Sequence, residues 1–242
     1  MTAARQAAVG LALAAVILAA WSGLHGWAVF WHRWGENDWW RAPLLVVAQT
    51  WLSVGLFIVA HDAIHGSLAP GWPRLNAAVG QICVALYAGF SLHSLAAAHR
   101  RHHAEPGRDG DPDFHPAAPH RFAAWFLGFF RHYFGWRELA VLSVATAAWL
   151  WLGARPLNLV VFWALPALLS ALQLFTFGTW LPHRHAEGGF ADEHRARSLD
   201  YPWALSLLAC FHFGRHREHH CRPEMPWWRL PAVKLQADRD PV

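Results

Sequence analysis

The chain has 242 residues, of which 55% are hydrophobic and only 15% are Asp, Glu, Lys or Arg. Soluble domains carry about 25% charged residues, so this composition excludes an ordinary soluble protein, a disordered chain and a nucleic-acid-binding tail. The 3 cysteines show no Cys-x-x-Cys spacing, so neither a disulfide framework nor a thiolate zinc site is implied. The net charge is a modest +4, and the 18 histidines are the second unusual feature.

Long uncharged runs predict membrane helices. With histidine counted as neutral, they cover 27 residues at 6–32, 20 at 42–61, 25 at 75–99, 16 at 139–154 and 28 at 156–183. A spanning helix needs roughly 20 apolar residues, so the first, second and fifth runs are predicted to span, and the first is too long for the core of a secretory signal. The fourth is short, but Arg137 and Glu138 can lie at the interface with their stems buried, so we predict a span there too.

The basic residues predict the orientation of these helices. If residues 1–5, 61–138 and 182–242 face the cytoplasm, seventeen of the twenty Lys and Arg residues lie inside. This asymmetry is what the positive-inside rule expects of four spanning helices with both termini cytoplasmic. Many tryptophans fall toward the predicted outer ends, as in an aromatic belt.

Three histidine clusters, called boxes below, are the candidate catalytic groups. They are His61 and His65, then His99, His102 and His103, and finally His216, His219 and His220. On a helix, spacings of i, i+3 and i+4 put side chains on one face, which suits convergence on a metal. Eight imidazoles where apolar sequence meets basic sequence predict a metal site, and their number indicates two ions. Imidazole suits Fe, Zn, Cu or Ni, so the spacing alone does not identify the metal. An apolar, cytoplasm-facing pocket favours iron, because O₂ and an apolar substrate would meet there.

The boxes also constrain the topology. If all of them serve one centre, the number of membrane crossings between any two must be even. Residues 66–98 must then lie along the interface or dip in and return, and 201–214 must stay on the cytoplasmic side. We therefore predict an all-α integral membrane protein, with four transmembrane helices, interfacial or re-entrant helices and a cytoplasmic histidine cap. It forms a single domain over 1–242 that ends in a frayed tail, 235–242.

At this point the chain resembles the membrane-bound histidine-box superfamily of desaturases and oxygenases, and within it the bacterial β-carotene ketolases (carotenoid 4-oxygenases). The stretches that carry the resemblance are HDAIHGSL at 61–68, HRRHH followed by GDPDF at 99–114, LPHR at 181–184, DEHRARSLD at 192–200, LLACFHFG at 207–214, and REHH with PWWRLP at 217–231. The resemblance implies two iron ions, O₂ as co-substrate and electrons from a reduced ferredoxin-like donor. It also implies that C4 of a β-ionone ring is hydroxylated twice and then loses water to leave a ketone, turning β-carotene into echinenone and canthaxanthin or, in many members, zeaxanthin into astaxanthin.

The resemblance further implies roles for individual residues. The eight histidines of the boxes are expected to bind iron, together with a ninth at the cytoplasmic end of the last spanning helix. We assign this ninth ligand to His183, with His185, His194 and His212 as alternatives. Carboxylates that hold imidazoles in one tautomer are predicted among Asp62, Asp113, Asp192 and Glu218, whose alternative role is that of plain loop or helix-end charges. The expected partners are a carotenoid, the electron donor and the lipid bilayer, in the bacterial inner membrane.

Other functions remain open at this point. Ring 3-hydroxylation and fatty-acyl desaturation belong to the same superfamily, although the LPHR and PWWRLP stretches favour the ketolase. A membrane zinc hydrolase would use HDAIH as a His-Glu-x-x-His box with Asp for Glu, but it would leave both His-x2-His-His boxes unused. A haem-binding or metal-transporting protein needs ligands within facing spanning helices, where His25 is the well-placed histidine.

Overall fold

The computed structural model describes residues 1–185 and 189–233, so the predicted frayed tail 235–242 lies outside the described residues. In this part of the chain the structure is helical, and its β-structure is limited to an isolated bridge between Ser198 and Arg215. The chain forms two compact units, each built from two stretches: unit 1 holds Met1–Leu92 and Phe134–Leu172, and unit 2 holds His93–Tyr133 and Gln173–Val242. The predicted all-α class is confirmed.

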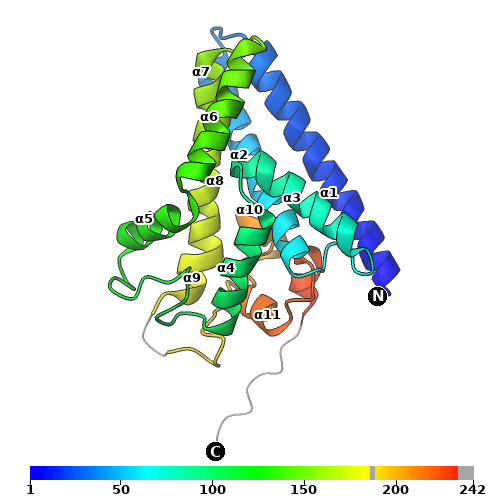
Figure 1. Cartoon of the computed structure of the whole chain (residues 1–242), viewed down its shortest axis with the longest axis vertical. Coiled ribbons are helices and arrows are strands. Elements are labelled where there is room, and N and C mark those ends of the chain that lie inside the picture. Colours follow the sequence, from blue (N-terminus) through cyan, green and yellow to red (C-terminus); the bar gives the residue numbers. More distant parts are fainter. Residues whose placement is uncertain (186–188, 234–242) are drawn as a thin grey trace, which may run out of the picture. The chain divides into compact units, whose positions relative to one another are not determined.

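Two long apolar helices form a hairpin in unit 1 (Figure 1). The first is α1 (Ala3–Gly26), which continues into the π-helical turn η1 (Trp27–Trp31), and the second is α2 (Asp38–Ile64). They run antiparallel, because the Gln6 amide donates to the carbonyl of Ser67 (2.9 Å) and the Trp21 indole N–H donates to the Ser53 hydroxyl (3.0 Å). Both helices are long and apolar enough to cross a membrane, as predicted.

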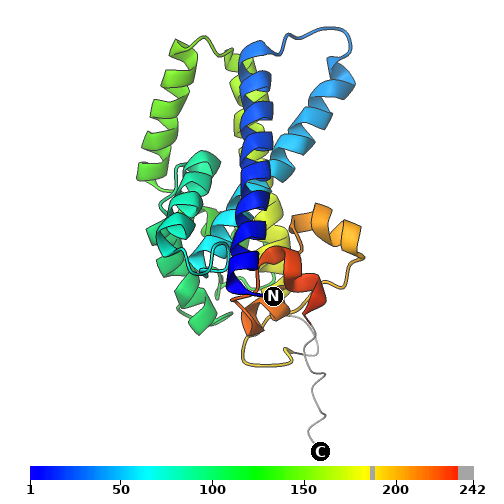
Figure 2. The ribbon, with the colours of Figure 1, turned by 90° about the vertical axis from the view of Figure 1, so that its right-hand side faces the viewer.

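The third long helix runs from Pro156 to His183 without a break in the chain. It comprises α7 (Pro156–Leu159), η2 (Val160–Ala164), α8 (Leu165–Leu174), η3 (Phe175–Trp180) and α9 (Leu181–His183). Near its start, the Asn158 amide donates to the carbonyls of Val29 (3.3 Å) and His32 (3.0 Å), and its oxygen accepts from the Trp34 indole (2.8 Å). These hydrogen bonds join the α1–α2 connection to the start of α7. The α1–α2 connection lies at one end of unit 1 (Figure 2).

The predicted count of four spanning helices is not confirmed. Three helices are long and apolar enough to cross singly, and the predicted fourth span corresponds to α6 (Trp136–Trp151), which has 16 residues. At about 1.5 Å per residue, such a helix is shorter than a hydrocarbon core of about 30 Å. The structure therefore supports three to four spans, the fourth depending on how the bent pair described next is placed.

The apolar run at 75–99 forms two helices with a sharp bend between them. α3 (Pro73–Ala88) and α4 (Leu92–Ala104) are bent by 96°, as in a broken span or a re-entrant segment. Gly89 adopts a left-handed conformation (φ 70°) that favours glycine, and the Gln81 amide bridges the turn between the Phe90 carbonyl and the Leu92 N–H. Such a bend is what a segment that dips in and returns requires.

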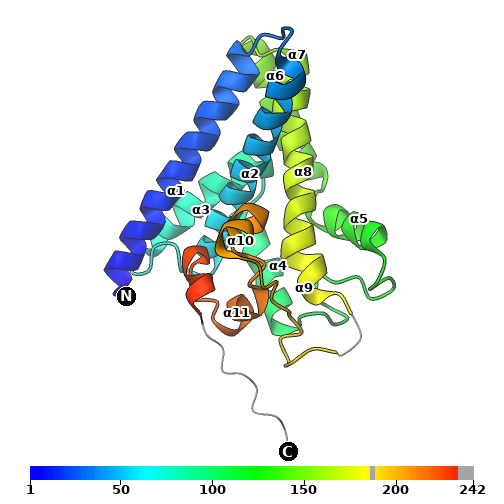
Figure 3. The ribbon, with the colours of Figure 1, turned by 180° about the vertical axis from the view of Figure 1, so that it is seen from behind.

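Unit 2 packs short helices around the end of the third long helix. They are α4, α5 (Phe122–Tyr133), α10 (Trp203–Cys210), α11 (His216–Cys221) and the 3₁₀ turn η4 (Trp227–Ala232), and Figure 3 shows α10 and α11. Gln173 donates to the carbonyls at the end of α10, and Gly178 lets Phe213 approach, because a Cβ on this glycine would lie 2.9 Å from the phenyl ring. With 8 residues, α10 is too short to cross, as predicted.

Candidate metal centre

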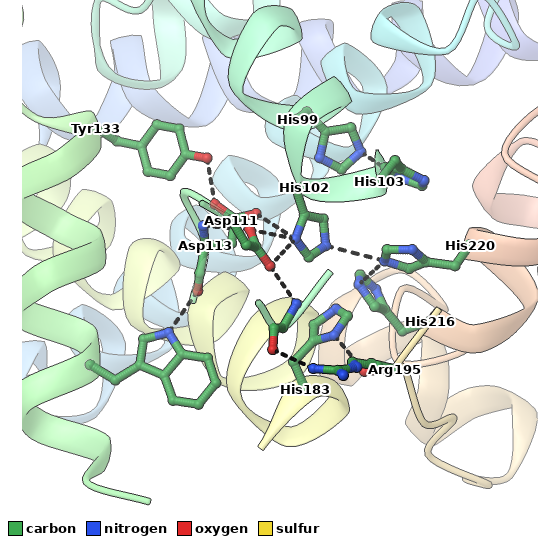
Figure 4. Close-up of polar contacts among 12 residues, drawn as sticks. His99, His102, His103, Asp111, Asp113, Tyr133, His183, Arg195, His216 and His220 are labelled. Atoms are coloured by element: carbon green, nitrogen blue, oxygen red, sulfur yellow. Dashed lines mark hydrogen bonds and ion pairs between the residues drawn. The ribbon is translucent and has the colours of Figure 1, made fainter. Parts of the chain in front are cut away.

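Three elements of unit 2 present the histidines. The spacing of His99, His102 and His103 puts them on neighbouring turns of α4, and α11 repeats this pattern with His216, His219 and His220. His183 ends the third long helix, where Pro182 occupies its last turn. Figure 4 shows imidazoles of α4, α9 and α11 pointing toward one another.

In the structure, histidines from different boxes come together in two groups, the first and the second cluster. The first cluster consists of His102, His183, His216 and His220. One ring nitrogen from each lies within 4.8 Å of those from the other three. Nε2 of His220 is 3.1 Å from Nε2 of His102 and 3.1 Å from Nε2 of His216. All four side chains are buried, with 1–3% of their surface exposed. Burial, and then the neighbouring His216 and His102, hold the pKa of His220 well below its ordinary value, so this imidazole stays neutral.

The second cluster consists of His99, His103 and His219. Nε2 of His103 lies 3.0 Å from Nε2 of His99 and 3.0 Å from Nε2 of His219. The remaining predicted pair, His61 and His65, lies at the end of α2 in unit 1, where the two ring centroids are 4.8 Å apart. Each three-histidine box thus contributes to both clusters. The helix α4 gives His102 to the first and His99 and His103 to the second, and α11 gives His216 and His220 to the first and His219 to the second.

The first cluster has the donor chemistry of a metal site. A neutral imidazole carries one N–H and one lone pair, and in both His102 and His183 the Nδ1–H is already engaged. His102 donates it to the carboxylate of Asp111, and His183 donates it to the backbone carbonyl of Arg195 (2.8 Å). Both Nε2 lone pairs therefore face the cluster, and Nε2 of His183 is buried without a hydrogen-bond partner. Converging lone pairs repel one another unless a cation lies between them.

The nitrogen separations agree with this interpretation. Two nitrogens that bind one ion at about 2.1 Å and at a right angle to each other lie about 3.0 Å apart. The contacts around His220 and His103, at 3.0–3.1 Å, are close to that separation. The residues present thus fit metal ions bound by imidazole, a ligand that suits Fe, Zn, Cu or Ni.

Asp111 orients His102, and the sequence reasoning missed it. Each of its carboxylate oxygens lies 3.0 Å from Nδ1 of His102, and the carboxylate also accepts the backbone N–H groups of Gly107 (2.7 Å) and Asp113 (2.8 Å). Burial alone would raise the pKa of Asp111, but the hydrogen bond and charge of His102, with the two backbone donors, bring it below its ordinary value. The carboxylate is therefore ionised, and it fixes the tautomer whose Nε2 binds metal.

Asp113, the predicted carboxylate of this loop, lies further from the His102 ring than Asp111 does. Its carboxylate is 3.7 Å from Nδ1 of His102 and accepts a hydrogen bond from the Tyr133 hydroxyl, while its backbone carbonyl accepts the Trp125 indole N–H (2.7 Å). Burial is the largest influence on Asp113, and it raises the pKa of this carboxyl above its ordinary value. Both aspartates belong to the GDPDF stretch, whose letters do not reveal which of the two faces the imidazole.

Comparison with known proteins assigns the chain to a family. Residues 37–142 and 134–240 fit the model of the family described as Fatty acid desaturase. The chain belongs to the fatty acid desaturase family. It is 48% identical over 237 residues to a β-carotene ketolase of Paracoccus sp. (strain N81106), covering 96% of this chain and 94% of that protein. The β-carotene ketolase of Paracoccus sp. (strain PC1) is also 48% identical, with 96% and 94% covered. The zeaxanthin 4-ketolase of Chlamydomonas reinhardtii is 34% identical, with 93% of this chain and 53% of that protein covered.

These relatives confirm the resemblance drawn from the sequence, and the family together with the apolar helices identifies an integral membrane protein. In this desaturase-family chain, two further predicted carboxylates join α11 to the segment that precedes α10. Asp192 accepts Nε–H of Arg217 (2.8 Å), and Glu218 accepts the Ser198 hydroxyl. The fourth, Asp62, is buried in α2 of unit 1, and its backbone carbonyl accepts the Ser67 hydroxyl.

The alternatives to His183 lie outside both clusters in the part of the desaturase-family chain that the structure describes. Nδ1 of His212 contacts the Ser206 hydroxyl at 3.0 Å, and its ring is stacked on Trp227. His185 stacks on Phe114, and the ring centroid of His194 is 6.1 Å from that of His220. Of these four histidines, the geometry of unit 2 therefore favours His183 as a metal ligand.

Proposed function

We propose that this protein is a β-carotene ketolase, an oxygenase that converts C4 of a β-ionone ring into a ketone. The observation that carries the proposal is the 48% identity over nearly the whole of this chain and of a Paracoccus β-carotene ketolase. Each of two hydroxylations takes one O₂, two electrons and two protons and releases one water. The resulting geminal diol loses a further water and leaves the ketone. Echinenone and canthaxanthin are the expected products of β-carotene.

The proposed cofactors are two iron ions, supported by the family and by the imidazole donors of unit 2. When bound, iron supplies the activation of O₂ and the oxidation of the C4–H bond. The proposed ligands are the four histidines of the first cluster and the three of the second. For His61 and His65, the proposal rests on their i, i+4 spacing and on the HDAIHGSL stretch.

The chain's own residues prepare the donors. Asp111 keeps Nδ1 of His102 protonated, so that Nε2 presents its lone pair. The carbonyl of Arg195 does the same for His183, and the depressed pKa of His220 keeps that ring neutral. Burial of all four rings of the first cluster excludes water from this side of the centre.

The remaining functional assignments are proposals of the same kind. A ferredoxin-like protein supplies the electrons, and the boxes and both termini face the cytoplasm in the bacterial inner membrane, as the distribution of Lys and Arg indicates. Residues 1–242 act as one domain, because each compact unit is built from two separated stretches of the chain. Oxidation of 3-hydroxylated rings is a second activity, supported by the likeness to the zeaxanthin 4-ketolase.

Expression in a β-carotene-producing bacterium tests the proposal. Pigment extracts are expected to contain echinenone and canthaxanthin, and also astaxanthin when a ring hydroxylase supplies zeaxanthin. Replacement of His102 by alanine should abolish ketone formation, whereas His93→Ala, on the exposed face of the same helix α4, should not. Yellow hydroxylated pigments without any ketone would show a 3-hydroxylase instead, and iron-free, zinc-containing protein would revive the hydrolase.

A further inference from the structure

We propose that Arg195 is a positioning residue of the first cluster, which holds His183 with its backbone and the His102–Asp111 pair with its side chain. The inference rests on the proposed function in one respect, since it assumes that the first cluster binds a metal. All of the contacts that carry it lie within unit 2, and Figure 4 shows them around His183 and Arg195.

The backbone of Arg195 aims its carbonyl at His183. Arg195 has a φ of 44°, in the left-handed region that residues with a side chain seldom occupy. A hydrogen bond from its N–H to the carbonyl of Asp192 (3.2 Å) closes the turn that holds this conformation. The carbonyl of Arg195 then accepts Nδ1–H of His183 at 2.8 Å. An unusual backbone conformation thus serves a contact that fixes the ring orientation and tautomer of one proposed ligand.

The side chain of Arg195 reaches the loop that orients the other ligand. Its Nη1 donates to the carbonyl of Gly107 at 3.1 Å. Gly107 itself has a φ of 63°, and its N–H donates to the carboxylate of Asp111 at 2.7 Å. Asp111 in turn accepts Nδ1–H of His102. A continuous series of hydrogen bonds therefore runs from His102 through Asp111, Gly107 and Arg195 to His183.

This series joins two imidazoles that come from different helices, α4 and α9, and that meet in the first cluster. Their ring centroids are 4.7 Å apart, so a small rotation of either ring changes how the two nitrogens converge. Groups that orient metal-bound imidazoles typically account for about 10- to 100-fold in metal affinity. Loss of Arg195 should therefore weaken binding at the first cluster, while the contacts among His99, His103 and His219 do not involve it.

Metal binding by purified variants tests the inference. Full-length protein in detergent is equilibrated with Fe(II), and with Co(II) for its absorption spectrum, and the bound metal per chain is measured together with the melting temperature of the metal-free form. Wild type should bind two ions. Arg195→Gly keeps the left-handed backbone but removes the guanidinium, and it should bind one ion about tenfold more weakly. Arg195→Ala also strains the turn and should lose more.

Matched controls separate positioning from general damage. Arg222→Ala removes an exposed arginine that pairs with Glu224, and it should bind both ions as wild type does. Gly107→Ala places a side chain at a positive φ within the series and should weaken the same ion, whereas Gly153→Ala, at φ 94° with open space around it, should not. Added guanidinium ion should restore much of the lost affinity of Arg195→Gly.

The outcomes distinguish the inference from the proposed function. Wild-type protein that binds no metal, or makes no ketone, contradicts the proposed function itself. If wild type binds two ions and Arg195→Gly binds both with unchanged affinity and an unchanged Co(II) spectrum, Arg195 is not a positioning residue. Equal loss of both ions with a lowered melting temperature of the metal-free form also overturns the inference, because it shows a structural role. If Arg195→Ala fails to fold, the Arg195→Gly variant decides.

Discussion

Replacement of Asp111 by asparagine is the sharpest test of the site. Both carboxylate oxygens lie 3.0 Å from Nδ1 of His102, and each also accepts a backbone N–H, from Gly107 at 2.7 Å and from Asp113 at 2.8 Å. An asparagine must replace one of these oxygens with an NH₂ group, which points a donor at a buried donor in either orientation. An unsatisfied buried donor costs about 1–3 kcal/mol, and the hydrogen bond to an ionised acceptor is lost as well.

The expected result is a loss of both stability and metal. Unfolding of the metal-free form should become easier by about 1–3 kcal/mol. Metal affinity should fall by about 10- to 100-fold, because the amide no longer increases the basicity of His102. Thermal unfolding, metal content and pigment analysis measure these effects. Asp109→Asn is the matched control, since Asp109 is an exposed aspartate of the same loop. If both variants retain metal and form ketone equally, Asp111 does not orient the ligand.

Three further predictions concern the ninth ligand, the packing of Phe213 against Gly178 and the dependence of stability on pH. His183→Ala should lose metal and ketone formation, whereas His185→Ala should retain both; metal analysis and pigment extracts compare them, and the reverse result would move the ligand to His185. Gly178→Ala should destabilise the protein by about 1–3 kcal/mol, because its Cβ would lie 2.9 Å from a packed phenyl ring, while Gly23→Ala, which has open space, should show no such loss in thermal unfolding. Burial lowers the pKa of His212 from 6.5 to about 4 in the folded protein. Between these two pH values the unfolded chain binds a proton that the folded chain does not, so the stability that neutral His212 confers is complete above pH 6.5 and is lost as the pH falls toward 4. In His212→Asn, a residue that tolerates the left-handed backbone here (φ 63°), unfolding measured against pH should show a smaller loss in that window, and an unchanged loss would contradict the assignment.

The spanning helices illustrate how far a linear pattern extends. The runs 6–32, 42–61 and 156–183 correspond to long helices in the structure. They could be predicted because the length of apolar sequence that a membrane span needs can be counted in the sequence itself. The run 75–99 is also long and uncharged, yet it bends at Gly89, where packing against Val141 leaves no room for a Cβ. Apolar length does not report such a bend.

The metal site divides in the same way. Spacing of i, i+3 and i+4 is local helix geometry, so the sequence of each box was enough to predict that its imidazoles lie close to one another on one helix. Which of them share a cluster with imidazoles of another box follows only from how α4, α9 and α11 pack. The choice of His183 over His212, and of Asp111 over Asp113 as the group on His102, depends on where distant stretches of chain meet. Arg195 belongs to the DEHRARSLD stretch, but its role could not be predicted from the sequence, because that role depends on a left-handed turn and on a carbonyl 88 residues away. The sequence by itself determined the class of protein, the ligand type and the boxes, whereas only the tertiary structure decided which side chains complete and orient the site, because hydrogen-bond partners across a fold follow from the path of the loops.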